Sequence, residues 1–234
     1  MNFCYDLHIH SALSPCGDED MTPNNIVNMA LIKGLDMIAV CDHNSARNIR
    51  AVAEVASGQL KVVPGIEVTT AEEVHTVCYF PDIESAEDMG RLLKEHLPPI
   101  KNRPEIFGRQ LVMDKNDEIV AEEDVLLINA TDLDIYEVQQ ETKKRGGWFV
   151  PAHIDRSSYS VISNLGFIPP DLEFDALEIT AKGLEEYYEK HKNQCILTSS
   201  DAHYLENITE NEDFFDINVK MPKKIPEFLY KFFV

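Results

Sequence analysis

Histidine and carboxylate residues recur in short motifs along most of this chain. The stretch DLHIHS places His8 and His10 two residues apart, and SSDAH places Asp201 and His203 at the same spacing. Residues two apart on a β-strand point to the same face, so each pair is expected to act together. Further members of the set are His43 in CDHN, Glu67 in GIEV, His75 in EVHTV and His153 in PAHI.

These residue types together predict a metal centre. Any one motif alone has an ordinary reading as a surface residue, a strand cap or a core hydrogen bond. Burying many imidazoles and carboxylates together without partners is costly, and a cluster of divalent cations supplies those partners. Mixed nitrogen and oxygen ligands suit zinc, manganese or iron better than calcium. The remaining histidines, His96 and His191, lie on polar helical segments and are expected at the surface.

Alternating strands and helices are predicted to position these residues. Strands are expected at 3–10, 35–43, 60–68, 72–80, 147–153, 174–180, 195–203 and 214–219, and helices at 22–34, 46–57, 83–97, 133–147, 182–192 and 225–234. Repeated β–α units of this kind indicate a parallel sheet or an α/β barrel. Six of the eight histidines fall at or near the downstream ends of the predicted strands, which is the rim where barrel active sites gather.

One segment interrupts the alternation. Residues 98–130 contain Pro-Pro and the stretch VMDKNDEIV, which is typical of a hairpin that turns at Asn116 and Asp117. We interpret residues 1–234 as a single domain in which about 98–130 form a small insertion, either a cap over the site or an ordinary long connection.

Composition restricts the class of protein. The chain has 234 residues, of which 44% are hydrophobic, enough for the core of one large α/β domain. No apolar run approaches the length of a membrane span, and the N-terminus lacks the pattern of a secretory signal. Five scattered cysteines without C-x-x-C spacing predict neither a disulfide framework nor a cysteine zinc site, so we expect a cytoplasmic protein. A net charge of -20 disfavours long nucleic acids as partners.

Five motifs, in this order, carry a resemblance to a known family. DLHIHS, CDHN, GIEVT, PAHIDR and SSDAH resemble the motifs of the PHP (polymerase and histidinol phosphatase) family, and the chain is most similar to its stand-alone bacterial phosphoesterases. The resemblance implies an α/β fold, a distorted TIM-like barrel of seven β/α units, with a trinuclear metal site at the carboxyl ends of the strands. Two departures are Cys41, where the family usually has threonine, and Ile154, where it usually has proline.

The resemblance also implies roles for individual residues. The implied metal ligands are His8, His10, Asp18, His43, Glu67, His75, His153, Asp201 and His203. The loop that carries Asp18 is longer than in common relatives, so Glu19, Asp20 or Cys16 are alternatives for the ninth ligand.

Three more residues are expected beside these ligands. Arg156 is expected to contact the substrate phosphate, because a guanidinium matches phosphate geometry; a surface ion pair is the alternative. Asp6 and Asp42 precede ligand histidines and are expected to accept imidazole N–H bonds, or else to cap strand ends.

The predicted activity is hydrolysis of a small phosphate ester, a monoester or a nucleotide, by metal-activated hydroxide. The expected cofactors are three divalent cations, with manganese, zinc or iron favoured and magnesium also compatible. Short oligonucleotides are compatible with such a site, and no membrane partner is expected. The alternatives are an amidohydrolase-like C–N hydrolase, against which the lack of a lysine at the relevant strand ends counts, and a non-catalytic metal-binding protein.

Overall fold

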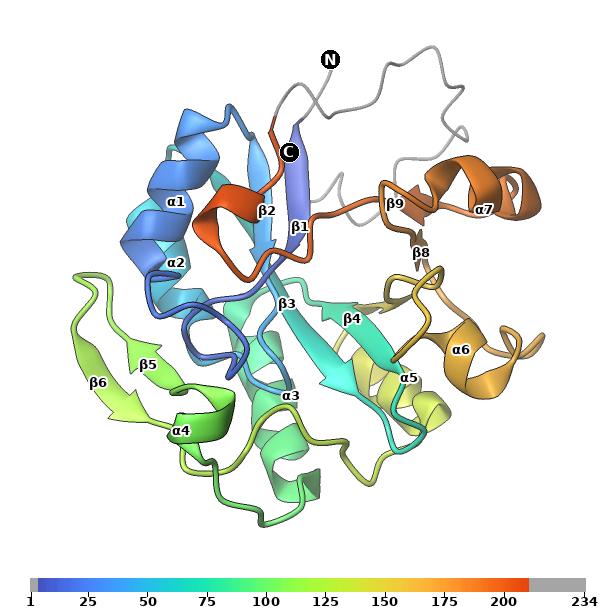
Figure 1. The fold of residues 1–234 in the computed structure, drawn as a ribbon, viewed down its shortest axis with the longest axis horizontal. Helices are drawn as coiled ribbons and strands as arrows, with labels where there is room; N and C mark the ends of the chain where they lie inside the picture. Colours follow the sequence, from blue (N-terminus) through green and yellow to red (C-terminus); the bar gives the residue numbers. More distant parts are fainter. Residues whose placement is uncertain (1–3, 211–234) are drawn as a thin grey trace.

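A five-stranded mixed sheet organises the molecule. The computed structural model describes residues 4–210. The strands, in their order across the sheet, are β1 (Tyr5–Ile9), β2 (Met37–Val40), β3 (Lys61–Thr69), β4 (His75–Tyr79) and β7 (Trp148–Pro151) (Figure 1). The first three run parallel, whereas β4 is antiparallel to both of its neighbours. The fold is therefore mixed α/β.

The direction of β4 differs from the sequence prediction of a parallel arrangement. Residues 70–74 are too few for a helical crossover, which a parallel connection requires, so β3 and β4 form a hairpin. Thr69 at the end of β3 pairs with His75 at the start of β4. The prediction that His75 lies at a downstream strand end is thus wrong, yet the reversal brings it to the same rim as the ends of β1 to β3.

Two short strands continue the arrangement beyond β7. β8 (Leu177–Glu178) and β9 (Ile196–Leu197) form a parallel pair. The Asp175 N–H donates to Phe149 O at 2.9 Å, which links β8 to β7, and the His10 N–H donates to Ala202 O at 2.8 Å, which links β1 to the segment after β9. These hydrogen bonds connect the segments beside the strands, but within residues 4–210 no continuous ladder closes the sheet.

An inner hydrophobic cluster lies among these strands. Its buried members come from the five strands of the sheet, from the pair β8–β9, or from residues directly beside them: Tyr5, Leu7, Met37, Ala39, Cys41, Val63, Val77, Tyr79, Val150, Ala152, Ala176 and Leu197. The pairing register of β1 shifts between Asp6 and Ile9. Leu7 belongs to this inner cluster, whereas Ile9 packs in an outer one. Such irregularities change the direction of side chains beside active sites.

Seven helices and one 3-10 turn occur within residues 4–210. They are α1 (Pro23–Ile32), α2 (Ile49–Ala56), α3 (Ile83–His96), α4 (Pro104–Phe107), α5 (Ile135–Lys144), α6 (Val161–Leu165), α7 (Leu184–His191) and the 3-10 turn η1 (Leu205–Asn207). The predicted start of α1 is confirmed, because Thr22 accepts the Asn25 N–H and Pro23 occupies the first turn. Helix α6, in contrast, was not predicted from the sequence.

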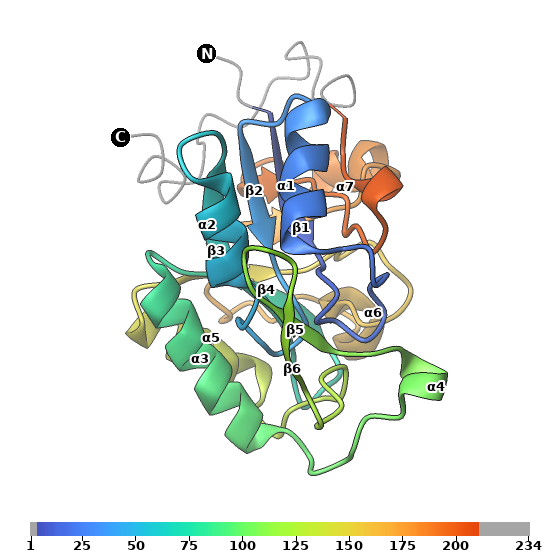
Figure 2. The same ribbon diagram turned by 90° about the vertical axis from the view of Figure 1, so that its left-hand side faces the viewer.

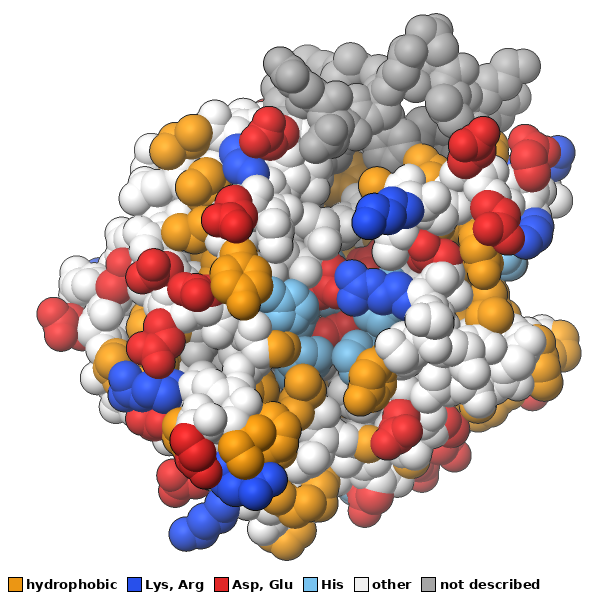
Figure 3. Space-filling model, viewed as in Figure 1, with side chains coloured by type: hydrophobic (Ala, Val, Ile, Leu, Met, Phe, Trp, Pro, Cys, Tyr) orange, Lys and Arg blue, Asp and Glu red, His pale blue; other side chains and the backbone are white. Residues whose placement is uncertain are grey.

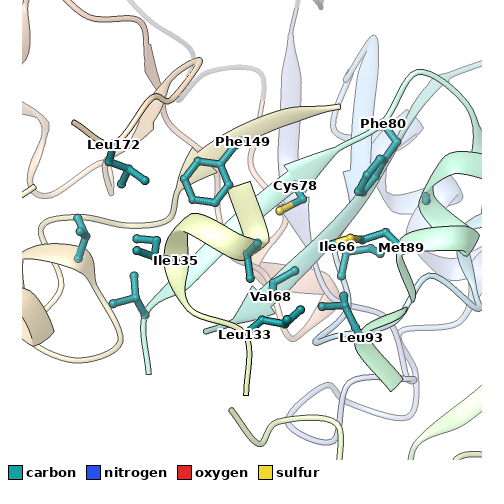
Figure 4. Packing of buried hydrophobic residues seen from close by; sticks show 14 of the residues in the cluster. Ile66, Val68, Cys78, Phe80, Met89, Leu93, Leu133, Ile135, Phe149 and Leu172 are labelled. Atoms are coloured by element: carbon teal, nitrogen blue, oxygen red, sulfur yellow. The ribbon is translucent and has the colours of Figure 1, made fainter. Parts of the chain in front are cut away.

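The largest hydrophobic cluster packs α3 and α5 against β3, β4 and β7. Ile66 and Val68 of β3 lie against Met89 and Leu93 of α3, and Phe149 of β7 lies on the α5 side (Figure 4). Every one of these side chains is fully buried. This packing fixes the ends of β3 and β4, from which two of the site residues project.

The predicted hairpin within 98–130 is confirmed. β5 (Leu111–Met113) and β6 (Ile119–Glu122) form an antiparallel pair, and α4 projects from the body of the molecule (Figure 2). The Asp117 carboxylate accepts hydrogen bonds from the Thr22 hydroxyl at 2.8 Å and the Asn24 N–H at 3.0 Å, so the hairpin turn caps α1.

Two further sequence expectations concern the ends of the chain and the membrane. The strand expected at 214–219 and the helix expected at 225–234 lie outside the described residues. Across residues 4–210, no helix combines the length and apolar character that crossing a bilayer requires.

Candidate metal centre

The buried carboxylate of Glu67 lies at the centre of a cluster of histidines. Distances from Glu67 Oε1 are 2.9 Å to His75 Nδ1, 3.2 Å to His153 Nε2 and 3.4 Å to His8 Nε2, and those from Oε2 are 3.1 Å to His43 Nδ1 and 3.4 Å to His10 Nε2. All five imidazoles are buried. The residues come from the ends of β1, β2 and β7 and from the hairpin β3–β4, so the fold brings together what the sequence separates.

Asp201 forms a second centre beside Glu67. Its Oδ1 lies 3.0 Å from His10 Nε2 and 3.5 Å from His8 Nε2, and its Oδ2 lies 2.6 Å from Arg156 Nη1. The His203 ring stacks on His10 with 4.2 Å between centroids, and His203 Nδ1 is 2.8 Å from the Asp201 carbonyl oxygen. Eight of the nine ligands expected from the sequence therefore lie together.

The donor set fits divalent cations. Three overlapping groups have ligand atoms within 4.8 Å of one another: His8, His10, Glu67 and Asp201; His10, His43 and His203; and His43, Glu67 and His75. Four buried imidazole nitrogens in this cluster have no hydrogen-bond partner: His8 Nε2, His43 Nδ1, His75 Nε2 and His153 Nδ1. Buried polar atoms of this kind need partners, and cations would supply them.

Electrostatics hold several of these groups in the protonation state that binds a cation. Burial raises the pKa of Glu67, but the neighbouring His75 and His8 outweigh it and hold that pKa well below its usual range. Burial lowers the pKa of His43, and burial together with His10 lowers the pKa of His203 to about 4. An ionised carboxylate and neutral imidazoles are the forms that ligate metals.

Glu178 supports His8 from the side opposite Glu67. Its two carboxylate oxygens lie 3.0 and 3.1 Å from His8 Nδ1, and Oε1 also accepts the His153 backbone N–H at 3.2 Å. The acceptor at Nδ1 directs the Nε2 lone pair of His8 toward Glu67 and Asp201. Sequence reasoning missed Glu178, although a carboxylate within the apolar strand FDALEIT was an available signal.

Asp42 acts on His10 through a serine, whereas a direct imidazole bond was expected. Ser14 Oγ donates to Asp42 Oδ1 at 2.8 Å and lies 2.9 Å from His10 Nδ1. The hydroxyl therefore accepts the His10 N–H while it donates to the carboxylate, which orients the imidazole. The Ser11 N–H and hydroxyl also donate to Asp42, at 2.7 and 2.6 Å.

Asp6 likewise differs from the expectation. Its carboxylate accepts backbone N–H groups of Ser200 at 3.1 Å, Thr209 at 3.0 Å and His8 at 3.4 Å, instead of an imidazole N–H. Asp6 is fully buried and lies in β1. Its bonds to Ser200 and Thr209 therefore tie the segment after β9 to β1. In the described structure Glu178 takes the role that the sequence assigned to Asp6.

The carboxylate of Asp18 lies outside the three groups of ligand atoms. Its backbone N–H donates to His203 O at 2.9 Å, and its Oδ1 accepts the Asp20 N–H at 2.9 Å, so it stabilises the loop beside His203. Of the alternatives, Glu19 and Asp20 are exposed and Cys16 is half-buried. The identity of a ninth ligand stays a prediction.

The backbone around the site is strained. Six non-glycine residues among 4–210 have positive φ, and four of them lie here: Asn44 at 49°, His153 at 28°, Tyr159 at 55° and Asp201 at 52°. A left-handed conformation costs about 1–3 kcal/mol per residue, and it persists where surrounding structure fixes it at a functional site.

A cavity of about 1070 Å³ adjoins the histidine–carboxylate cluster. Its lining includes His153, Arg156 and Asp201, together with Lys182 and several hydroxyl side chains (Ser157, Ser158, Thr180, Ser199, Ser200). Figure 3 shows histidines at the floor of a hollow beside a basic side chain. None of the residues that line this cavity in the described part of the chain comes from 98–130. The hairpin instead packs on the loop after β1, where the Leu111 N–H donates to Ala12 O.

The chain is similar to known proteins in sequence and in fold. The family model described as PHP domain matches residues 6–213. A 5'-3' exoribonuclease of Haemophilus influenzae is 36% identical over 72 residues, which are 31% of this chain and 23% of that protein. The match thus spans about a quarter of the relative.

Solved structures share the fold at low sequence identity. The lesion-specific endonuclease EndoQ of Pyrococcus furiosus has a TM-score of 0.67 at 19% identity, covering 88% of this chain and 49% of that one. A structure from Bifidobacterium adolescentis, described as that of a metal-dependent phosphoesterase, has a TM-score of 0.58 at 19% identity, covering 91% and 94%. Since the family model extends over nearly all described residues and over every motif that supplies the histidine cluster, the chain belongs to the PHP domain family.

Proposed function

We propose that this protein is a metal-dependent phosphoesterase that hydrolyses a small phosphate ester, either a monoester or a nucleotide. The observation that carries the proposal is the convergence of five buried imidazoles on Glu67, with a guanidinium at the edge of the same cluster. A guanidinium at this position is suited to bind a phosphoryl oxygen, a role that a purely metal-binding protein would not need. This proposal includes the trinuclear site and the distorted seven-stranded barrel that the family resemblance implies.

The residues that would hold the cations are the eight clustered histidines and carboxylates, with Asp18 as the proposed ninth. Bound divalent cations lower the pKa of a water molecule and offset the negative charge of a phosphoryl group. Glu67 is the proposed shared ligand, because each of its oxygens faces a different set of imidazoles. Glu178 and Ser14 keep His8 and His10 in the tautomer that presents Nε2 to the cluster.

Arg156 is the proposed phosphate-binding residue. Its side chain is 43% exposed, lines the cavity and contacts Asp201 at 2.6 Å, so it lies between the ligand cluster and the space open to substrate. A guanidinium binds two phosphoryl oxygens at once and neutralises charge as the ester bond breaks. The hydroxyl-rich walls of the cavity suit the polar remainder of a phosphorylated metabolite.

Nucleic-acid ends are the second candidate substrate. Relatives of this chain are named exoribonucleases, and a neighbour of the same fold is named an endonuclease. The net charge of -20 argues against long nucleic acids as substrates, because it repels a polyanion outside the immediate site. We therefore rank mononucleotides and small monoesters first and short oligonucleotides second.

The test measures bound metal and phosphate release together. The full chain is stripped with EDTA, reloaded with manganese or zinc, and assayed on phosphate monoesters, nucleotides, short oligonucleotides, amides and lactones. His10→Ala and Asp201→Ala should each lose bound metal and lose phosphate release to the background level. His96→Ala is the matched control, since His96 lies on α3 and pairs with Asp132 at 2.6 Å. Undiminished phosphate release from both cluster variants would refute the proposal, and turnover of amides alone would assign C–N hydrolysis.

A further inference from the structure

We infer that Tyr159 is a stacking platform for a planar ring of the substrate, which makes nucleotides the substrate class of this site. The inference rests on the proposed phosphoesterase function and adds the recognition of a nucleobase to it. It depends on the position of Tyr159 at the rim of the metal centre, on the exposure of its ring and on the backbone that holds it.

The ring of Tyr159 lies on the histidine cluster and remains open to solvent. It stacks on His75 with 4.8 Å between ring centroids and 25° between planes, and the tyrosine is 47% exposed. His75 in turn lies 2.9 Å from Glu67, so one ring separates Tyr159 from the central carboxylate. Figure 3 shows hydrophobic side chains bordering the exposed histidine surface in this hollow.

The backbone of Tyr159 is fixed without help from its side chain. Its carbonyl accepts the His75 N–H at 2.8 Å, and its φ of 55° is a conformation that tyrosine rarely adopts. Directly after Tyr159, Ser160 Oγ donates to Arg156 O at 2.7 Å and caps α6. Strain retained at a half-exposed aromatic residue beside a reactive site indicates a role for the ring in binding.

One loop therefore carries two complementary recognition groups. In DRSSYS, Arg156 and Tyr159 are three residues apart, and each contacts a different ligand residue, Asp201 or His75. A guanidinium recognises phosphate, and an aromatic ring recognises the face of any nucleobase irrespective of its hydrogen-bonding edge. A sugar phosphate or glycerol phosphate would engage the arginine alone, whereas a nucleotide engages both.

The competing explanation is that Tyr159 only shields His75 from water. The two explanations differ in what a substitution does. Loss of a shield would weaken metal binding and impair every substrate alike. Loss of a stacking platform would leave the metal in place and impair only substrates that carry a ring.

The experiment compares adenosine 5'-monophosphate with ribose 5-phosphate, which shares its sugar and phosphate but lacks the base. Tyr159→Ala should raise KM for adenosine monophosphate about 5- to 150-fold, the range that base–aromatic stacking provides, and leave KM for ribose 5-phosphate unchanged. Tyr159→Phe should behave like the parent. Tyr159→Leu covers His75 without an aromatic face and should behave like Tyr159→Ala. Calorimetric titration with adenosine gives a readout without turnover, and its Kd should rise by the same factor.

Controls separate this inference from the proposed function. Bound metal, measured for every variant, should stay at the parent level. Equal losses on both substrates together with lost metal would overturn the stacking inference in favour of shielding, and unchanged kinetics in Tyr159→Ala would overturn it outright. A parent protein that releases phosphate from no ester would instead refute the proposed function.

Discussion

Replacing Glu178 by glutamine tests whether the buried support of His8 sets the strength of metal binding. Glu178→Gln keeps the volume of the side chain and an oxygen that can accept the His8 Nδ1–H, and it removes the negative charge. The carboxylate lies 3.0 Å from His8 Nδ1 with only 3% of its side chain exposed, so water cannot replace it. Alanine would be a poorer choice, since it leaves two buried N–H groups of His8 and His153 without acceptors, at about 1–3 kcal/mol each.

The expected magnitude follows from the role of the carboxylate. Residues that orient a metal-ligating histidine typically contribute a factor of about 10–100 to metal affinity, which corresponds to about 1.4–2.8 kcal/mol. The glutamine variant should therefore bind zinc about 10- to 100-fold more weakly at one step of its titration.

The assay is a zinc titration of the full chain against a competing chelator at pH 7, with thermal unfolding measured in parallel. Glu173→Gln is the matched control, because Glu173 lies in the same segment and is exposed. A folded Glu178→Gln variant with parental zinc affinity at every step would refute the reasoning, and it would show that the bond to His8 serves packing alone.

Two further predictions concern the edge of the site and the pH dependence of stability. Arg156→Ala should retain its metal and lower kcat/KM for the best phosphate ester about 10- to 100-fold, the worth of a charge-assisted contact, and kinetics equal to the parent would exclude Arg156 from the site. Burial raises the pKa of Glu123, but Lys94 at 2.8 Å and Arg47 at 3.1 Å outweigh burial, and the net pKa lies below the usual range. Its ionised form therefore stabilises the fold above the unfolded-state pKa and loses that effect as pH falls through the folded-state value. Urea unfolding should show Glu123→Gln less stable by about 1–2 kcal/mol at pH 7, with the difference shrinking below about pH 4, and a constant difference would contradict this origin.

Much of the histidine–carboxylate cluster was predictable because its residues follow strands. His8, His43 and His153 end or follow apolar runs, and the carboxyl ends of neighbouring strands meet at one rim. The hairpin at Asn116 and Asp117 was predictable because its turn residues are distinctive.

Other features depended on partners that are distant in sequence. The direction of β4 follows from the short connection at 70–74, which outweighs the β–α rhythm around it. Glu178 contacts a histidine 170 residues away, so its role is visible only in the folded structure. Ser14 intervenes between Asp42 and His10, and no pattern in the chain distinguishes that serine from its neighbours.

The hairpin β3–β4 places a limit on how this protein can vary in length. Glu67 is opposite Val77 and Thr69 is opposite His75, so the central carboxylate and one imidazole share a face through strict pairing. A one-residue slip of pairing would turn His75 to the opposite face while Glu67 stayed in place. The length of the turn at 70–74 thus sets the register of the hairpin. A single-residue insertion or deletion there should disturb the cluster far more than a longer one within the exposed helix α4.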